Sequence, residues 1–382
     1  MSYIPTPGFA RSLVACAIAS LSLAAVADDA SNQNTIEHSI AKDETIVVTA
    51  SRMPTRYNQL IADVSVVDQE KIQEYGAAAQ ISDVLANEPG ITVQTSGGLG
   101  SQTTVSMRGM KNGQSLLLVD GMRIDSATSG GATWAYVPLQ QIGRMEIVRG
   151  PSATMYGSDA MGGVVQLFTR KGEGAAKIYA DAGYGTYGTS AETAGVEGSS
   201  NGFSYSVYGA NTHSLGMPSY TSASGDFNPN NASYTNSSGS TRLAYTMQPG
   251  QEIGASVVYG QGRNAYTGTS VDSTAMAYQS QIFSVASVYT QNKILDNWTS
   301  LVRFGYSDDN QKNYQAGGIP DGNFQTTQNQ IQWQNNVTLP IGRALLGYEF
   351  LQQNVNSSTA YTVTSRNVNS FIAGWNGDCL LY

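Results

Sequence analysis

The side chains with the most chemical potential in this sequence are arginines and aromatics, not catalytic or metal-binding clusters. The two histidines, His38 and His213, stand alone, and no CxxC, HExxH, P-loop or EF-hand pattern occurs. Asp226, Asp272 and Asp321 are scattered, so we expect no calcium or other metal site. The pattern favours a binding protein with no cofactor and no catalytic residues.

Two arginines beside glycines, Arg108 and Arg149, are candidates for buried ion pairs. Each follows a run of residues that favours a β-strand. A buried guanidinium group needs a carboxylate partner. Glu146 and Asp120 are the local partners that the sequence offers.

One segment has the composition of a strand that could pair with another protein. It alternates Thr, Val and Ile over Glu44, Thr45, Ile46, Val47, Val48, Thr49 and Ala50. Such a segment can add to the edge of a partner's sheet through backbone hydrogen bonds, which would transmit a pull. The alternative is that it forms the first strand of the following domain. The polar residues before it and Pro54 after it favour docking to a partner.

Residues 60–172 must position these side chains, and they read as a compact α+β domain. A strand is expected at Val64–Asp68, and Asp68 can cap a helix over Gln69–Tyr75 that ends at Gly76. A second helix is expected at Ile81–Ala86. Short strands alternate with Gly-rich turns at Ile91–Gln94, Thr104–Met107, Ser115–Val119, Met145–Val148 and Val164–Thr169.

Residues 177–382 lose the helical signals and alternate large apolar with polar residues. Phe203–Val207, Glu252–Tyr259, Trp298–Tyr306 and Leu346–Phe350 show this pattern. Apolar residues facing out and polar residues facing in are typical of a transmembrane β-barrel, and we expect about ten strands. Polar loops are expected at Leu215–Ser240, Gln261–Tyr278 and Ser307–Asn323. A soluble sandwich would give similar alternation.

The N-terminus predicts export. Arg11 precedes an uncharged apolar run, and Ala25-Val26-Ala27 supplies a small-x-small cleavage site, so residues 1–27 are expected to be a cleaved signal peptide. Residues 28–59 are expected to be a flexible N-terminus. With 20 Lys+Arg against 28 Asp+Glu the net charge is −8, which gives no support for nucleic-acid binding.

Four blocks in order resemble the plug of TonB-dependent outer-membrane receptors. They are Met107-Arg108-Gly109, Leu116–Gly121, Arg144–Ala153 and Tyr156–Val165. The segment Glu44–Ala50, followed by Ser51-Arg52, resembles the TonB box that precedes such plugs. The box, the last block and Ile331–Val337 are most similar to the cobalamin receptor subfamily, and siderophore receptors share the plug pattern.

The resemblance implies partners and site residues. It implies a small-molecule nutrient such as cobalamin or a siderophore, energy coupling by TonB at residues 44–50, and an outer-membrane location in contact with lipid. Arg108 and Arg149, with Glu146, would secure the plug to glutamates of the barrel wall. Outward-facing plug loops would contact the substrate, with these candidates: Ser96, Gly97, Gly98, Leu99, Asp125, Ser126, Trp134 and Tyr136. Trp134 and Tyr136 could stack on a flat ligand or pack against the wall.

The sequence departs from the family in length. A full receptor barrel has roughly 22 strands, whereas residues 177–382 supply about ten at the spacing seen here. Cys379-Leu380-Leu381-Tyr382 breaks the preceding alternation. We therefore expect a plug followed by a truncated barrel that is inactive alone. The remaining alternative of another class is a secreted, soluble, β-rich binding protein.

Overall fold

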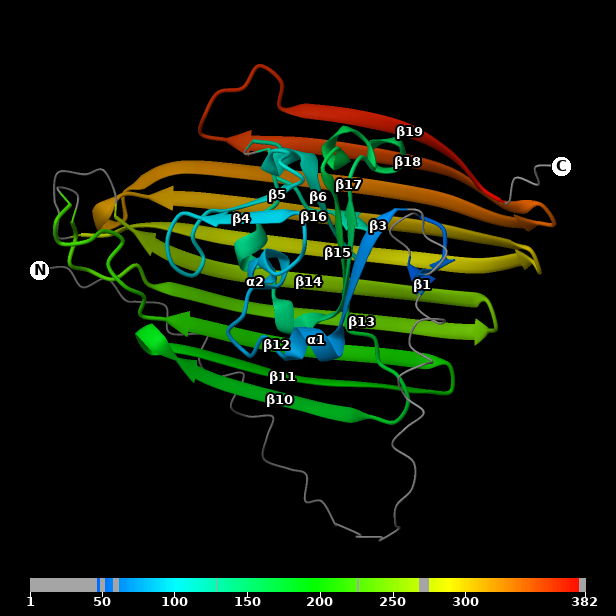
Figure 1. The fold of residues 1–382 in the computed structure, drawn as a ribbon, viewed down its shortest axis with the longest axis horizontal. Helices are drawn as coiled ribbons and strands as arrows, with labels where there is room; N and C mark the ends of the chain where they lie inside the picture. Colours follow the sequence, from blue (N-terminus) through cyan, green and yellow to red (C-terminus); the bar gives the residue numbers. More distant parts are fainter. Residues whose placement is uncertain are drawn as a thin grey trace, which may run out of the picture. The chain divides into compact units, whose positions relative to one another are not determined.

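The computed structural model describes residues 47–48, 52–57, 62–128, 130–224, 227–267 and 275–377. Glu44–Tyr382 form one compact unit. It contains a small mixed domain (residues 62–170) and a large antiparallel sheet (residues 177–376), and the small domain lies against the middle of that sheet (Figure 1).

The small domain is built on a five-stranded sheet. Its strand order is β3 (Asp63–Asp68), β8 (Ile142–Arg149), β9 (Gly163–Thr169), β6 (Ser115–Val119) and β7 (Met122–Arg123). The β6–β9 pair is parallel and the other pairs are antiparallel. A separate hairpin joins β4 (Ile91–Thr95) to β5 (Thr103–Met107), and another joins β1 (Val47–Val48) to β2 (Thr55–Arg56).

The helices of the small domain are short, and two of them begin at residues with capping interactions. The α-helices are α1 (Gln69–Gln73), α2 (Ile81–Ala86) and α3 (Ala153–Tyr156). The Asp68 carboxylate accepts a hydrogen bond from the Lys71 N–H at 3.0 Å, as the sequence predicts. The 3₁₀-helices are η2 (Asn112–Gln114), η3 (Trp134–Tyr136), η4 (Leu139–Gln141), η5 (Ser158–Ala160), η6 (Thr186–Gly188) and η7 (Ala316–Gly318).

The core of the small domain lies on both faces of its sheet. Every residue of β6 is buried, so this strand is a continuous apolar run rather than an alternating one. Leu117 and Ile147 pack with helix residues Ile81 and Leu85 in one cluster. The α+β class expected from the sequence is therefore confirmed.

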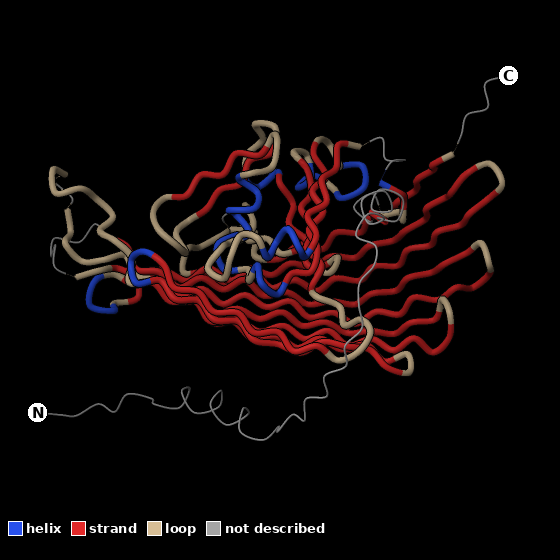
Figure 2. Tube along the Cα trace, turned by 60° about the horizontal axis from the view of Figure 1, so that its bottom comes forward, coloured by secondary structure: helices blue, strands red, loops and turns tan. Residues whose placement is uncertain are grey.

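The large sheet contains ten antiparallel strands in sequence order, as predicted. They are β10 (Lys177–Gly185), β11 (Thr189–Ser200), β12 (Phe203–Ser214), β13 (Tyr234–Gln248), β14 (Gln251–Tyr266), β15 (Ala277–Leu295), β16 (Trp298–Tyr314), β17 (Pro320–Leu339), β18 (Gly342–Ser357) and β19 (Ser365–Asn376). Figure 2 shows them as one curved sheet with the small domain on one face.

The strands run further into the polar segments than the sequence predicts. β13 begins at Tyr234, inside the expected loop Leu215–Ser240, and β16 extends to Tyr314, inside the expected loop Ser307–Asn323. β14 likewise continues to Tyr266. The loops were therefore predicted too long. Backbone pairing with a neighbouring strand does not require apolar side chains, so hydropathy alone does not mark where a strand ends.

The large sheet has short connections at one end and longer ones at the other. Two-residue turns at 201–202, 249–250, 296–297 and 340–341 form the short-turn end. The connections 215–233 and 358–364 lie at the opposite end, which we call the long-loop end.

The burial pattern of the large sheet is inverted relative to a water-soluble sheet. Gln330 and Thr326 face the small domain and are only 4% and 1% exposed, whereas Trp333 and Phe371 are 49% and 84% exposed. Further apolar side chains on the strands are exposed: Val257, Val288, Phe304, Leu346 and Trp375. Among the described residues, no helix is long and apolar enough to cross a membrane.

Candidate functional site

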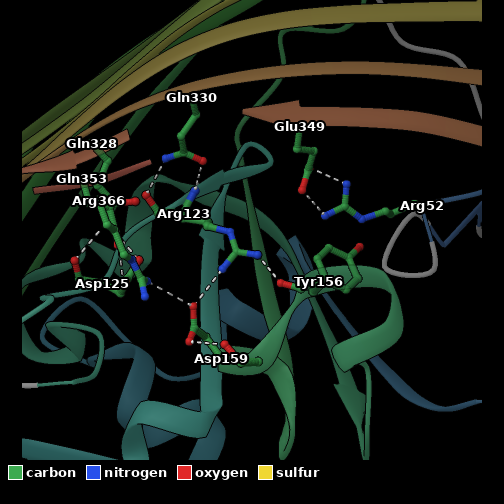
Figure 3. A network of polar contacts seen from close by, with 11 residues as sticks. Arg52, Arg123, Asp125, Tyr156, Asp159, Gln328, Gln330, Glu349, Gln353 and Arg366 are labelled. Carbon is green, nitrogen blue, oxygen red and sulfur yellow. Dashed lines mark hydrogen bonds and ion pairs between the residues drawn. The ribbon is translucent and has the colours of Figure 1, made fainter. Parts of the chain in front are cut away.

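A bidentate ion pair joins the segment before the small domain to the large sheet. Arg52 donates from Nη1 to Glu349 Oε1 at 2.5 Å and from Nη2 to Glu349 Oε2 at 3.0 Å. The two side chains are 10% and 14% exposed. The Arg52 guanidinium also lies over the Tyr156 ring, 4.3 Å from its centroid (Figure 3). We call this group, Arg52 with Glu349 and Tyr156, the anchor.

The electrostatics of the anchor favour a charged arginine. Burial acts to lower the pKa of Arg52, but the Glu349 carboxylate overcomes it and holds the pKa above its ordinary value. Burial raises the pKa of Tyr156 to about 12, although the nearby Arg52 acts in the opposite direction. The ion pair is therefore formed, and the phenol neutral, throughout the physiological pH range.

A second contact between the two parts is made at the β6–β7 turn. Asp120 and Gly121 have φ angles of +47° and +83°, which is the two-residue turn that Asp-Gly favours. The Asp120 carboxylate accepts from the Thr169 N–H at 3.1 Å and from Thr169 Oγ1 at 2.7 Å, and it pairs with Arg242 of β13 at 3.1 Å. A Cβ on Gly121 would lie 1.9 Å from Arg303 Nη1, so another residue here would need both a strained positive φ and a shift of that guanidinium group.

The arginines expected to secure the plug to the barrel wall pair inside the small domain instead. Arg149 donates to Glu88 at 2.6 Å and to Asp63 at 3.3 Å, and Arg108 donates to Asp63 at 2.6 Å. Neither arginine pairs with Glu146 or Asp120, the local alternatives. Glu146 is fully buried and pairs with Arg144. The reason is that β3 lies beside β8, which brings Asp63 opposite Arg149 in the register.

Only part of the predicted TonB-binding segment lies within the described residues. Val47–Val48 form β1, which pairs antiparallel with Thr55–Arg56. Glu44, Thr45, Ile46, Thr49 and Ala50 lie outside the described residues. β1 is not a strand of the five-stranded sheet. The segment ends two residues before Arg52 of the anchor.

The Gly-rich turn Ser96–Leu99 is held at the long-loop end. The Ser96 N–H donates to Gln102 O at 3.0 Å, and Leu99 O accepts from Asn264 Nδ2 of β14 at 3.0 Å. Ser96 and Gly97 are exposed, whereas Gly98 and Leu99 are half-buried. The first two candidates are therefore open to solvent.

The loop from Asp125 to Trp134 is tied to the large sheet at both ends. Asp125 accepts hydrogen bonds from Gln328 Nε2 at 2.9 Å and from Gln353 Nε2 at 3.3 Å (Figure 3). Ser126 is buried and bridges to Gly131 through its N–H at 3.0 Å. At the other end Thr133 Oγ1 donates to the buried Asp309 carboxylate of β16.

Trp134 and Tyr136 are packed and do not offer open ring faces. Each is 1% exposed. Trp134 Nε1 donates to Asn112 Oδ1 at 3.1 Å, and the Tyr136 ring lies 6.0 Å from the ring of Tyr234 in β13. Burial raises the pKa of Tyr136, with a further contribution from Tyr234. Of the two alternatives for these aromatics, packing describes the structure, because the large sheet covers them.

Two cavities at the long-loop end border these loops. One of about 330 Å³ lies between the Asp125 loop and the β18–β19 end of the sheet, and it is lined by Asp125, Asp159, Gln353, Tyr361 and Arg366 among others. The other, of about 340 Å³, lies between residues 100–103, the start of η3 and the strands β15–β17. Both offer hydrogen-bonding groups around a partly apolar hollow, which suits a polar small molecule.

A third cavity, of about 440 Å³, lies at the short-turn end. Five arginines line it together with Glu252 and Asp296: Arg52, Arg123, Arg242, Arg303 and Arg343. No group of three or more His, Cys, Asp or Glu side chains that could hold a metal ion occurs among the described residues.

Sequence reasoning missed Glu349, which pairs with Arg52, and Arg242, which pairs with Asp120 of the small domain. Each is a lone charged residue within an otherwise uncharged stretch of strand. That isolation is the signal that could have found them, since a charge on the inner face of such a sheet needs an opposite charge nearby.

Comparison with known proteins identifies the small domain. Residues 58–164 match the family described as TonB-dependent Receptor Plug Domain. The chain is 28% identical over 368 residues to the vitamin B12 transporter BtuB of Photobacterium profundum, covering 94% of this chain and 57% of that protein. It is 38% identical over 146 residues to BtuB of Vibrio vulnificus, covering 38% of this chain and 24% of that protein.

Solved structures share the fold of both parts. The ferric enterobactin receptor PfeA of Pseudomonas aeruginosa, as a mutant, superposes with a TM-score of 0.64 at 20% identity, covering 81% of this chain and 51% of that one. The siderophore receptor PirA of Acinetobacter baumannii gives 0.63 at 20% identity, covering 81% and 50%. This chain thus spans little more than half the length of the relatives that it matches over most of its own length.

The four sequence blocks, the match to the plug family and the shared fold of both parts agree with one another. The chain is therefore similar to the TonB-dependent receptors: a domain that matches their plug family is followed by ten antiparallel strands with the fold of their barrels.

Proposed function

We propose that this chain takes part in TonB-driven uptake of a scarce nutrient across an outer membrane, with cobalamin as the first candidate. The observation that carries the proposal is the anchor. The predicted TonB-binding segment, residues 44–50, leads directly into Arg52, whose guanidinium is held by Glu349 of the large sheet at 2.5 and 3.0 Å.

This arrangement suits a mechanical signal. A strand added to the edge of TonB's sheet is held by several backbone hydrogen bonds at once. A pull on residues 44–50 would therefore reach the Arg52–Glu349 pair before it reaches the small domain. Breaking that pair would leave only main-chain contacts between this segment and the sheet among the described polar contacts, from Gln334 to the Arg52 oxygen and from Arg343 to the Pro54 oxygen.

The burial pattern supports a location in lipid. Outward-facing Trp333 and Phe371 are 49% and 84% exposed, while the inward glutamines are buried. Exposed apolar faces of this extent are unfavourable in water and favourable in a bilayer. The secreted soluble alternative predicts the opposite arrangement.

Substrate contact is proposed for the two loops at the long-loop end, residues 96–99 and 125–134, which carry all the candidate residues except Tyr136. Their cavities are near the lower limit for ligand pockets, so a large nutrient would rest across both loops. Cobalamin is preferred because the curated relatives are vitamin B12 transporters. A siderophore is the alternative because the solved neighbours include siderophore receptors.

Binding to the purified protein in detergent tests the substrate. We expect cyanocobalamin to bind and ferric enterobactin not to bind in isothermal titration. Asp125→Asn should weaken cyanocobalamin binding about tenfold, whereas Asp296→Asn, at a fully exposed turn of the opposite end, should leave it unchanged. Binding of ferric enterobactin alone would transfer the assignment to the siderophore class.

Two further experiments test the location and the coupling. Membrane fractions washed with sodium carbonate should retain the protein until detergent is added, and release by the wash alone would favour the soluble alternative. A peptide of residues 44–50 should bind the TonB C-terminal domain. Val48→Pro should abolish that binding because proline lacks the N–H, while Val48→Thr should keep it. Equal binding by the proline peptide would contradict strand addition.

A further inference from the structure

One strand of the large sheet contacts the main chain of the small domain at regular intervals. The strand is β17, and the partner is the segment 121–127, which begins in the β6–β7 turn and includes β7. Four side chains make five hydrogen bonds of this form: Gln332 Nε2 donates to Gly121 O (2.9 Å), Gln330 accepts from Arg123 N (3.1 Å) and donates to Arg123 O (3.2 Å), Gln328 Nε2 donates to Asp125 O (3.0 Å), and Thr326 Oγ1 accepts from Ala127 N (3.0 Å).

The contacts follow an antiparallel register. Positions 332, 330, 328 and 326 on β17 meet positions 121, 123, 125 and 127 in order. Alternate residues of a strand point to the same face and lie about 6.6–6.8 Å apart. The inward side chains of β17 therefore match the main-chain groups of the segment one for one. We call this set of contacts the β17 ladder.

The ladder covers an edge that would otherwise be unpaired. β7 is the last strand of the five-stranded sheet, so its outer N–H and C=O groups have no neighbouring strand. The main-chain N–H groups of this segment point in two directions. The N–H of Ile124 points into the small domain and donates to Leu117 O at 3.2 Å. The N–H of Arg123 instead points to Gln330 of β17 (Figure 3).

The side chains of the ladder are uncharged, and all are buried except Gln332, which is half-buried; in the partner segment Ala127 is exposed. Thr326, Gln328 and Gln330 are 1%, 1% and 4% exposed. A buried main-chain group that loses its partner is costly, so the segment is held in this register and not in one shifted by a residue. At its short-turn end the same strand continues the pattern, because Gln334 Nε2 donates to the main-chain oxygen of Arg52 in the anchor.

We propose that the inward face of β17 positions the small domain: Thr326, Gln328, Gln330 and Gln332 set the register of segment 121–127 along β17. This register in turn fixes where the Asp125 loop lies beside its cavity. The proposal concerns the position of the loop and holds whichever nutrient is carried. It treats these three glutamines and the threonine as positioning residues, in contrast to side chains that merely make the interior polar.

Amide hydrogen exchange on the purified protein in detergent tests each contact separately. Gln330→Leu should speed exchange of the Arg123 amide about tenfold or more and leave the Ile124 amide unchanged. Thr326→Val, which keeps the shape and removes the acceptor, should free the Ala127 amide and not that of Arg123. Gln325→Leu is the matched control, because Gln325 lies on the same strand and donates to Asp308 of the large sheet.

The pattern of freed amides decides between the two roles. If Gln330→Leu and Thr326→Val each free only their own amide, the ladder is established. If neither variant changes exchange relative to Gln325→Leu, the ladder is overturned. A general increase that includes the Ile124 amide would show loss of the fold, and would contradict a contact-by-contact register.

Loop position is measured by electron–electron distance spectroscopy between spin labels at Thr128 and Val363, on opposite sides of the 330 Å³ cavity. Native cysteines are replaced by serine in all samples. The double variant Gln330→Leu/Thr326→Val should broaden the distance distribution at least twofold, and Gln325→Leu should not. An unchanged distribution in the double variant would refute the positioning role even if the amides exchange faster. Neither measurement uses a nutrient, so its failure is distinct from failure of the proposed substrate.

Discussion

Replacing Glu349 by glutamine should release the chain at Arg52 from the large sheet. The substitution keeps the shape of the side chain and removes its charge. Arg52 then retains a guanidinium group that is 10% exposed, with no carboxylate in contact. The segment that leads from residues 44–50 should open, while the large sheet stays folded because Glu349 contributes to it only through its backbone pairing.

The magnitude follows from the geometry. Removing one partner of a buried ion pair costs about 3–5 kcal/mol. Both side chains here retain some contact with solvent, so we take the lower value of about 3 kcal/mol, which is roughly a hundredfold in the opening equilibrium. The stacking of Arg52 on Tyr156 remains, as does the hydrogen bond from Gln334 to the Arg52 main-chain oxygen, and both prevent a larger effect.

Trypsin cleavage after Arg52 measures the opening. When opening is fast relative to cleavage, the cleavage rate follows the population of the open form. Glu349→Gln should cut about a hundred times faster than the wild type, by the equilibrium above. Asp296→Asn, which disrupts an exposed pair with Lys293, should change the rate less than threefold. Rates for Glu349→Gln within twofold of wild type would refute the anchor.

The pH response of the anchor adds a check. The pKa of Arg52 is raised above its ordinary value, so its contribution is fully present below that ordinary value and is lost only at still higher pH. Cleavage after Arg52 should therefore be insensitive to pH between about 6 and 9, once the pH dependence of trypsin itself is corrected for.

Three further predictions concern single side chains. The wild-type protein should lose about 2–3 kcal/mol of stability between pH 10 and 12, because the pKa of Tyr156 is raised from 10.0 to about 12 and unfolding frees the phenol to ionise. Tyr156→Phe has no phenol and should not show this loss. Urea unfolding at pH 9 and 11.5 measures the difference, and the same pH dependence in both proteins would contradict the prediction. Gly121→Ala should lower the melting temperature more than Gly174→Ala, since both have positive φ but only Gly121 faces a side-chain clash, with Arg303. Trp134→Phe should reduce stability by about 1–3 kcal/mol and leave cyanocobalamin affinity within twofold of the wild type. A large loss of affinity would instead indicate that Trp134 stacks on the ligand.

The elements of the fold were largely predictable because their signals are local. Asp68 caps α1, Ile81–Ala86 form α2 as expected, and the Asp-Gly pair at 120–121 makes a turn of the kind that this dipeptide favours. The ten strands of the large sheet follow from a two-residue alternation that any strand with one apolar face must show. Their ends were not predictable, because pairing with a neighbour carries β13 and β16 into polar sequence.

The contacts between the two parts were not predictable. Arg52 and Glu349 are separated by 297 residues, and no local pattern specifies which distant carboxylate a given arginine meets. The sequence pointed to Arg108 and Arg149, but the alignment of β3 with β8 supplied both with partners inside the small domain.

The sequence by itself determined the resemblance to the plug family, the α+β character of the small domain and the number of strands, because motif order, turn residues and hydrophobic periodicity are properties of neighbouring residues. Only the tertiary structure decided that Arg52 meets Glu349, that Trp134 and Tyr136 are covered, and that β17 faces the edge of β7. Those outcomes depend on how the small domain packs against the large sheet. The register of that packing is set by the sum of many weak contacts between distant parts of the chain.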